Sequence, residues 1–338
     1  MVRSDFIMEI RGYMINPREK RLRALWRVVL WFFVAAFGAI VFAGTLSQLV
    51  NPASFGPGLR ATYVAVRQIA VYAGLTAIAV GVGYLLDRRH LSDYGLGFDR
   101  QWWRDAAFGL GLGIGLPTLF LLGQLATGLL TVTGLLVTGP SDTFAFGPLG
   151  AVERLALLGL FFIVQASAEE IVVRGYLLTN AAEGLAGTLG KWRAVVVTTV
   201  ATGVLFGVLH AANPSSSLLS VANITLYGVL LGGCYVLTGR LGIACGFHVA
   251  WNFTLGLYGF PVSGLRTGAA LVGTRATGSA VLTGGSFGPE GGLIALVGLL
   301  LGTLALAWWV GREYGDVAVR EAIAIPTLRY AIRENHER

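Results

Sequence analysis

The sequence predicts an all-α protein that crosses a membrane several times. Of its 338 residues, 55% are hydrophobic and only 13% are charged, and the mean hydropathy is +0.69. A soluble domain usually carries about 25% charged residues, so this composition suits a surface that faces lipid. Apolar runs of about 20 residues recur along the chain, and such a run crosses the ~30 Å hydrocarbon core as a helix. Helices are expected because the hydrocarbon offers backbone groups no hydrogen-bond partners.

Eight apolar runs are expected to form transmembrane helices. The first begins only after 27 residues and is too long for a signal-peptide core, which indicates a retained helix. Pro117 lies inside the third run and is expected to kink it. The runs cover residues 28–48, 68–86, 106–134, 155–180, 194–212, 217–238, 241–260 and 292–311.

The positive charges are distributed unevenly across these spans. Assigning the loops alternately to the two sides places 20 of the 25 Lys and Arg residues on the side of the termini and 5 on the other. Lys and Arg are retained on the cytoplasmic side of a membrane, so both termini are expected to be cytoplasmic. The same asymmetry explains the net charge of +7 without a nucleic-acid partner. We therefore expect a multi-pass protein of the cell membrane whose surroundings are the lipid bilayer.

The spans suggest a division of the chain into five parts. Cys234 and Cys245 lie within apolar runs without metal-type spacing, so they are expected to be packing residues. The segment 261–291 is rich in Gly, Ser and Thr, which predicts an irregular extracytoplasmic loop. The parts are a basic N-terminal segment (1–27), three helices (28–154), a core of four helices (155–260), this loop (261–291), and the last helix with a cytoplasmic tail (292–338).

Strongly polar side chains within the apolar runs are few. A charged group at the centre of a membrane helix costs about 2.5–3.5 kcal/mol, so each one is a functional candidate. Only two acidic residues, Glu169 and Glu170, lie well inside a run, and only two histidines do, His210 and His248. Asn252 joins them on the seventh run. These residues come from three separate helices that are able to converge.

Spacing divides the two glutamates into different roles. Glu170 and Arg174 are four residues apart in the favoured acid-before-base order, so they are expected to pair on one helix face. Glu169 is rotated from Glu170 by about 100° around the helix and faces elsewhere. The spacing therefore predicts one supporting carboxylate and one free carboxylate.

The histidines also have partners one turn away. His248 and Asn252 are four residues apart and are expected to project together from the seventh helix. Phe206 and His210 have the same spacing on the fifth, which places an aromatic ring beside the imidazole.

These residues form three short motifs in a fixed order. EExxxR spans Glu169–Arg174, FxxxH spans Phe206–His210, and HxxxN spans His248–Asn252. Together they resemble the CPBP family of intramembrane glutamic endopeptidases, also called the CAAX prenyl endopeptidase or Abi family. The resemblance extends over about residues 155–256.

The resemblance implies an intramembrane endopeptidase that needs no metal and no other cofactor. It implies that Glu169 and His210 activate water, and that His248 and Asn252 stabilise the oxyanion. Glu170, Arg174 and Phe206 correspond to supporting positions. The chemistry is reasonable on its own terms, because a partly desolvated carboxylate suits a general base and fixed N–H donors suit a developing oxyanion. The expected substrate is a peptide or a segment of a membrane protein.

Two other interpretations of the same residues stay open. Glu169, His210 and His248 are able to form a three-ligand zinc site with an open position, although no HExxH helix is present. Alternatively, the polar groups serve a non-catalytic scaffold or immunity protein, or a proton relay in a proton-coupled transporter. If the chain is an enzyme, we expect the site in a cavity that opens toward the cytoplasm.

Overall fold

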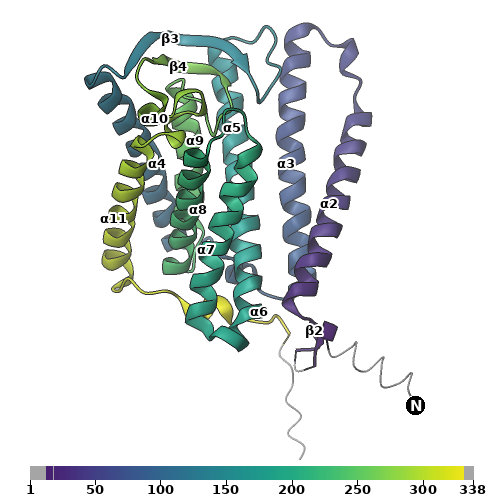
Figure 1. Ribbon diagram of the computed structural model, residues 1–338. Coiled ribbons are helices and arrows are strands. Elements are labelled where there is room, and N and C mark those ends of the chain that lie inside the picture. Colours follow the sequence, from purple (N-terminus) through teal and green to yellow (C-terminus); the bar gives the residue numbers. More distant parts are fainter. Residues whose placement is uncertain (1–12, 18, 331–338) are drawn as a thin grey trace, which may run out of the picture.

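A computed structural model describes residues 13–17 and 19–330 and confirms the all-α membrane fold (Figure 1). Long helices stand side by side, with a small sheet at one end of the bundle. The two described ends of the chain meet at the other end, where the backbone N–H of Arg329 donates to the carbonyl of Arg88 and the Arg21 side chain donates to the carbonyl of Asp87. Residues 1–12, 18 and 331–338 of the two expected cytoplasmic segments lie outside the described residues.

The predicted runs correspond to the long helices in order. The fourth run is the middle of a continuous 39-residue helical segment, which consists of α5, the π-helix η3 and α6. The helices are α2 (Ala24–Leu49), α3 (Pro57–Asp87), α4 (Arg100–Ala126), α5 (Ala151–Glu170), η3 (Ile171–Leu178), α6 (Thr179–Leu189), α7 (Lys191–Leu209), α8 (Leu218–Thr238), α9 (Gly242–Leu257), α10 (Ala280–Thr283) and α11 (Ile294–Tyr314).

Within the described residues, seven helical segments, rather than eight, are long and apolar enough to cross a membrane. The exception is α9, which has 16 residues and a length of about 24 Å at 1.5 Å per residue. This is shorter than the ~30 Å hydrocarbon core. Thirteen of its residues are buried, including Phe247 and Trp251. The seventh run is therefore the apolar central helix of the bundle, and its sequence resembles a span because protein surrounds it on every side.

Two boundary predictions are wrong at the end of the bundle that carries the sheet. The third run was expected to be helical to residue 134, but α4 ends at Ala126 and β3 (Leu130–Ser141) follows. The loop 261–291 was expected to be irregular, but it contains β4 (Thr267–Ala276), which pairs antiparallel with β3. Val and Thr are frequent in β3 and favour a strand, and each strand satisfies backbone groups of the other. A second hairpin, β1 (Ile15–Asn16) with β2 (Arg21–Leu22), precedes α2.

Glycines allow α9 to pack closely against α4. A Cβ atom on Gly109 of α4 would lie 2.3 Å from the carbonyl oxygen of Ile243, and one on Gly246 of α9 would lie 2.2 Å from that of Ala106. Small residues four apart let membrane helices approach at the backbone. This contact fixes the position of α9, which carries one of the three motifs.

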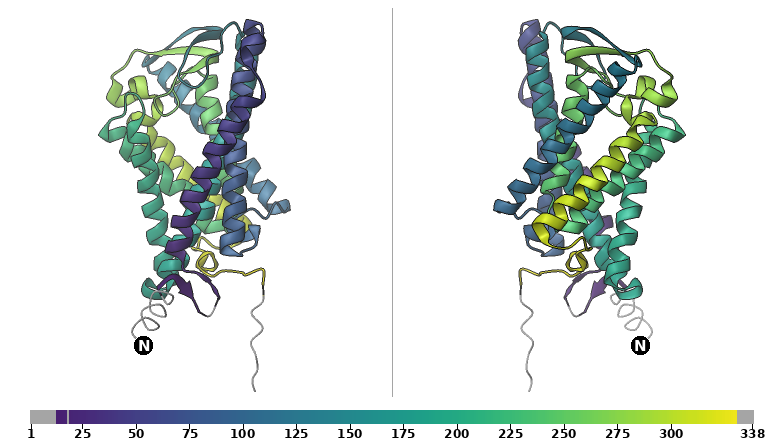
Figure 2. Two further views of the ribbon diagram at one scale, coloured as in Figure 1. Left: turned by 90° about the vertical axis from the view of Figure 1, so that its right-hand side faces the viewer. Right: turned by 90° about the vertical axis from the view of Figure 1, so that its left-hand side faces the viewer.

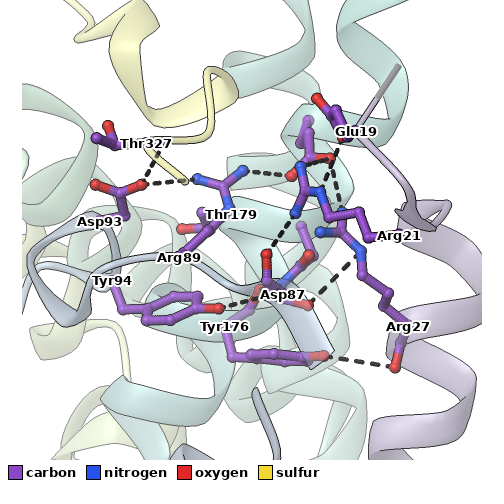
Figure 3. Close-up of polar contacts among 12 residues, drawn as sticks. Glu19, Arg21, Arg27, Asp87, Arg89, Asp93, Tyr94, Tyr176, Thr179 and Thr327 are labelled. Atoms are coloured by element: carbon purple, nitrogen blue, oxygen red, sulfur yellow. Dashed lines mark hydrogen bonds and ion pairs between the residues drawn. The ribbon is translucent and has the colours of Figure 1, made fainter. Parts of the chain in front are cut away.

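At the end of the bundle that carries the termini, three arginines surround one carboxylate. Glu183 of α6 accepts hydrogen bonds from Arg21 and Arg27, both at 2.7 Å, and from Arg89. The three arginines are buried although the sequence places two of them in a basic N-terminal segment. Asp87 lies beside them and accepts from Tyr94 at 2.6 Å, as the close-up shows (Figure 3). We call Arg21, Arg27 and Arg89 the arginine cluster.

The arginine cluster fastens α2 to α3 and α6. Helix α2 lies on the outside of the bundle (Figures 1 and 2). In its most apolar stretch of 18 residues, only 6% of the residues are buried. A helix with so little buried surface gains little from packing, so the buried ion pairs at its first turn are its main polar attachment. The position of α2 matters because it forms one wall of the cavity described below.

Adding a methyl group at Gly109 should disrupt the contact between α4 and α9. We expect Gly109→Ala to lower the free energy of unfolding by about 1–3 kcal/mol, because the new Cβ overlaps the backbone of α9. Thermal unfolding of the purified protein in detergent measures this change. Gly111→Ala is the matched control, since no atom lies within 4 Å of a Cβ there. Equal stability of the two variants would contradict the packing argument.

Candidate functional site

Side chains of the three motifs line one large cavity inside the bundle. Its volume is about 1050 Å³, at the upper end of the range for ligand sites. All four candidate catalytic residues contribute to its wall, and so does Phe206. The four residues are Glu169, His210, His248 and Asn252. The cavity therefore brings together positions that lie far apart in the sequence.

Behind the cavity wall, Glu170 and Arg174 form the expected pair. Arg174 Nη1 donates to Glu170 Oε1 at 2.8 Å, and both side chains are fully buried. The same carboxylate oxygen lies 2.8 Å from Nδ1 of His248 on α9. Since a carboxylate oxygen accepts, Nδ1 of His248 carries the hydrogen. Glu170 thus fixes the orientation of the His248 ring, a role that the spacing alone did not indicate.

Arg174 also contacts α7 and α8. Its Nη2 donates to the carbonyl of Gly228 on α8 at 3.1 Å, and its guanidinium lies 4.5 Å from the centre of the Phe206 ring on α7. The side chain is fully buried, so Arg174 lies inside the bundle and not on its surface.

Phe206 lies between the two histidines of the site. Its ring centre lies 4.5 Å from that of His210 and 5.8 Å from that of His248. The aromatic ring therefore separates the imidazoles and also covers the guanidinium of Arg174.

Glu169 is the free carboxylate that the spacing predicted. Its Oε1 accepts a hydrogen bond from Gln165, one turn earlier on α5. Its Oε2 is buried and has no hydrogen-bond partner among the described residues, and it lies 3.9 Å from His248 Nε2. The side chain remains 31% exposed, on the cavity side. One oxygen is therefore oriented and the other is available.

A hydrogen bond to the backbone of Phe206, one helical turn earlier, orients the His210 ring. Its Nδ1 lies 2.7 Å from the carbonyl of Phe206. A carbonyl oxygen only accepts, so Nδ1 carries the hydrogen and Nε2 of the neutral ring is an acceptor. No hydrogen bond joins His210 to Glu169 directly in the described part of the chain, so the two residues share the cavity without touching.

Asn252 is buried on the cavity wall one turn after His248. No hydrogen bond to its side-chain amide is formed within residues 13–17 and 19–330. The amide atoms are not among the fully buried polar atoms that lack a partner, so the amide reaches the open space of the cavity that the residue lines. Its N–H₂ is thus available as a donor beside His248.

The cavity has an apolar end and a polar end. At the end nearer the termini, Trp31 of α2 stacks on Tyr176 at 4.4 Å, and Tyr176 in turn contacts the backbone of Arg27 in the arginine cluster. At the end nearer the sheet, the lining includes Asp142 and Asn213, which lie in the segments after β3 and α7. Asp142 and Asn213 therefore lie at the end of the cavity that faces away from the termini, and the ring stack lies at the other end. The expectation of an opening toward the cytoplasm stays a prediction.

Asp142 keeps a negative charge on the polar end. Hydrogen bonds from the Arg266 side chain and backbone lower the pKa of Asp142 to about 2. The carboxylate therefore stays ionised at neutral pH.

Helix lengths explain how His210 and His248 reach the same cavity. The α5–η3–α6 segment has 39 residues and a length of about 58 Å, which exceeds the ~30 Å hydrocarbon core. The α6–α7 corner lies at the foot of the bundle, beyond the lower end of α11 (Figure 1). Helix α7 begins at this corner, and its 19 residues lead back along the bundle to His210 on the cavity wall.

The polar residues at the cavity that sequence reasoning missed include Gln165 and Glu290. Gln165 is four residues before Glu169, and this spacing was a usable signal. Glu290 is a buried carboxylate that also lines the cavity, but its partners are remote in sequence and no spacing indicated it.

Comparison with known proteins identifies the part of the chain that carries the motifs. Residues 151–254 match the family model described as type II CAAX prenyl endopeptidase Rce1-like. This confirms the resemblance, over less than half of the chain, and supports a CAAX-type membrane endopeptidase at the level of the family. No curated protein matches the chain. No solved structure matches it.

Removing the charge of Glu170 should destabilise the fold. In Glu170→Gln, Arg174 and His248 lose their shared carboxylate within the protein interior. Breaking a buried pair costs about 3–5 kcal/mol, so we expect the melting temperature of the purified protein to fall. Glu153→Gln, on the exposed start of the same helix, should leave it unchanged. A Glu170→Gln protein as stable as the parent would show that the pair does not hold these helices.

Proposed function

We propose that the chain is a glutamate-dependent CAAX-type intramembrane endopeptidase in which Glu169 acts as the general base. The observation that carries this proposal is the state of the Glu169 carboxylate. One oxygen is oriented by Gln165 and the buried Oε2 has no partner, while the residue lines a cavity shared with His210, His248 and Asn252. Such a group is suited to accept a proton from a water molecule in that cavity.

His210 is the proposed second partner of the water. Because its Nδ1–H donates to the carbonyl of Phe206, its Nε2 is able to accept one hydrogen of the water while Glu169 accepts the other. The water oxygen then attacks the carbonyl carbon of the peptide, and its proton moves to Glu169. Glu169 returns this proton to the leaving nitrogen as the C–N bond breaks, so one carboxylate acts as base and then as acid.

His248 and Asn252 are the proposed donors to the oxyanion. The Asn252 amide has free N–H groups, and it lies one turn from His248 on the same helix. The hydrogen on His248 Nδ1 is engaged by Glu170, so donation from Nε2 requires the imidazolium form, which the adjacent carboxylates Glu169 and Glu170 stabilise electrostatically. Fixed donors of this kind are each worth about 10²–10³ in kcat.

The proposed substrate is a peptide segment associated with the membrane. Apolar side chains with exposed surface border the cavity on α2 and α7, among them Phe32 and Leu209. They face the surrounding lipid, whereas the polar end carries Asp142 and Asn213. The cavity therefore suits a substrate with an apolar part held in lipid and a peptide part held near the polar residues.

The grouping of side chains does not favour the zinc interpretation. Across the described residues, no three His, Cys, Asp or Glu side chains are arranged to hold a metal ion.

Cleavage should depend on Glu169 and His210. We expect Glu169→Gln and His210→Ala to lower kcat by at least about 100-fold, since each removes a proton acceptor for the water. The assay uses purified protein in liposomes and two peptides, one with a prenylated cysteine followed by three residues and one without the prenyl group, with products identified by mass spectrometry. Glu153→Gln is the control. If Glu169→Gln cleaves as fast as the parent, Glu169 is not the general base. If the parent itself cleaves neither peptide, the enzyme proposal gives way to a scaffold or a proton-coupled transporter.

The same assay distinguishes the two chemical mechanisms. Activity should persist after prolonged treatment with a strong chelator and removal of the chelated metal, because the proposed mechanism uses only protein groups. Loss of activity that added Zn²⁺ restores would instead support the three-ligand site.

A further inference from the structure

Glu290 is a buried carboxylate that plays no part in the proposed mechanism. It lies between α10 and α11, outside both residues 151–254 and the expected core at 155–260. Only 4% of it is exposed, and it lines the cavity. Because an unpaired charge in this environment is costly, its contacts indicate what it does.

Both carboxylate oxygens of Glu290 accept hydrogen bonds from cavity-wall residues. Oε1 accepts from the indole Nε1 of Trp251 at 2.9 Å. Oε2 accepts from the backbone N–H of Ser263 at 2.6 Å and from its hydroxyl at 3.1 Å. Trp251 is the residue before Asn252, and Ser263 lies in the segment after α9. One carboxylate therefore joins the motif helix α9 to the segment that follows it.

Hydrogen bonds also link Ser263 to Asn213 and, through Asn213, to His210. The carbonyl of Ser263 accepts from the side-chain amide of Asn213 at 2.8 Å, and the backbone N–H of Asn213 donates to the carbonyl of His210 at 3.1 Å. Ser263 has φ of +48°, a conformation that costs a residue other than glycine of order 1–3 kcal/mol unless its surroundings hold it. The two hydrogen bonds to Glu290 supply that support.

The backbone of Glu290 is itself fixed from α8. The side-chain amide of Asn223 donates to the carbonyls of Glu290 and Gly292, both at 2.9 Å. Close packing adds to this, because a Cβ on Gly288 would lie 2.1 Å from the carbonyl oxygen of Pro261. The position of Glu290 is thus fixed, and two series of contacts connect it to the site. One reaches Asn252 through Trp251, and the other reaches His210 through Ser263 and Asn213.

We propose that Glu290 is a positioning residue that holds Asn252 and His210 in the relative positions that catalysis needs. This inference rests on the proposed function, since it assigns both residues to the reaction. Glutamine fits the same space, but its N–H₂ would face either the indole N–H or the backbone N–H of Ser263, so at least one donor would lose its acceptor. Asn252 and His210 would then be held less firmly in their relative positions, although the fold persists.

Kinetics of Glu290→Gln test this role against a merely structural one. We expect kcat to fall about tenfold or more while KM changes less than threefold, because Glu290 acts through other residues. Asp105→Asn is the matched control, because Asp105 is also a buried carboxylate that accepts from an indole N–H, that of Trp309 at 2.8 Å, but it does not line the cavity. Its kcat per folded protein should equal that of the parent. Unchanged kcat in Glu290→Gln, or an equal loss in Asp105→Asn, would overturn the proposal.

Trp251→Phe removes the indole donor to Glu290 Oε1, and Ser263→Ala removes the hydroxyl donor to Oε2 while the backbone N–H of residue 263 remains. The effect of Glu290→Gln should be smaller when it is introduced into these backgrounds, because contacts in one chain are not additive. Fully additive losses would show that Glu290 acts by another route.

Hydrogen exchange measured by mass spectrometry provides a readout that needs no activity. Glu290→Gln should speed exchange in residues 210–217 and 260–266, and Asp105→Asn should not. If the parent has no peptidase activity, the proposed function fails while this result still decides whether Glu290 holds the two segments. Unchanged exchange in both segments would refute the positioning role.

Discussion

The buried pair of Glu170 and Arg174 is the interaction on which the site depends. Arg174 contacts the Phe206 ring of α7 and the Gly228 carbonyl of α8, while Glu170 binds His248 of α9. Four helical elements are therefore joined through one ion pair that no water reaches. Burying two charges costs more than their attraction returns unless every remaining donor finds a partner. Here Arg174 Nε and Glu170 Oε2 have no hydrogen-bond partner among the described residues, so the pair is not fully satisfied, and its contacts serve to place the motif residues.

The same pair explains why the two adjacent glutamates differ. Glu170 points into the bundle and is occupied, whereas Glu169, about 100° around the helix, points to the cavity and keeps one oxygen without a partner. A site for peptide hydrolysis needs both conditions at once, namely a rigid support and an unsatisfied base. The π-helix η3 begins immediately after these residues, at a place where such irregular turns are common in functional sites.

Two polar assemblies at opposite ends of the bundle have different consequences. The arginine cluster fastens α2, α3 and α6 at the end nearer the termini, and so it determines where the apolar wall of the cavity lies. The contacts of Glu290 lie toward the sheet and join the segments that carry Asn252 and His210. The first assembly shapes the cavity, and the second orients groups within it.

Local spacing was sufficient to predict much of this protein. Apolar runs gave the membrane helices, and contacts within one helical turn, such as Glu170 with Arg174 or Phe206 with His210, follow from the 3.6-residue period. The matching of residues 151–254 to a peptidase family agrees with the three motifs. These features depend only on neighbours along the chain, so the sequence by itself determined them.

The tertiary structure decided what depends on remote neighbours. The apolar α9 resembles a span in sequence, but it is enclosed because glycines admit it against α4. Strand β4 forms only because β3 lies beside it, and Glu290 finds Trp251 and Ser263 only after α8, α9 and the segment before α11 have packed. Hydropathy and residue spacing do not predict such partners. The residues in each contact are far apart in the chain, and their separation follows no regular period.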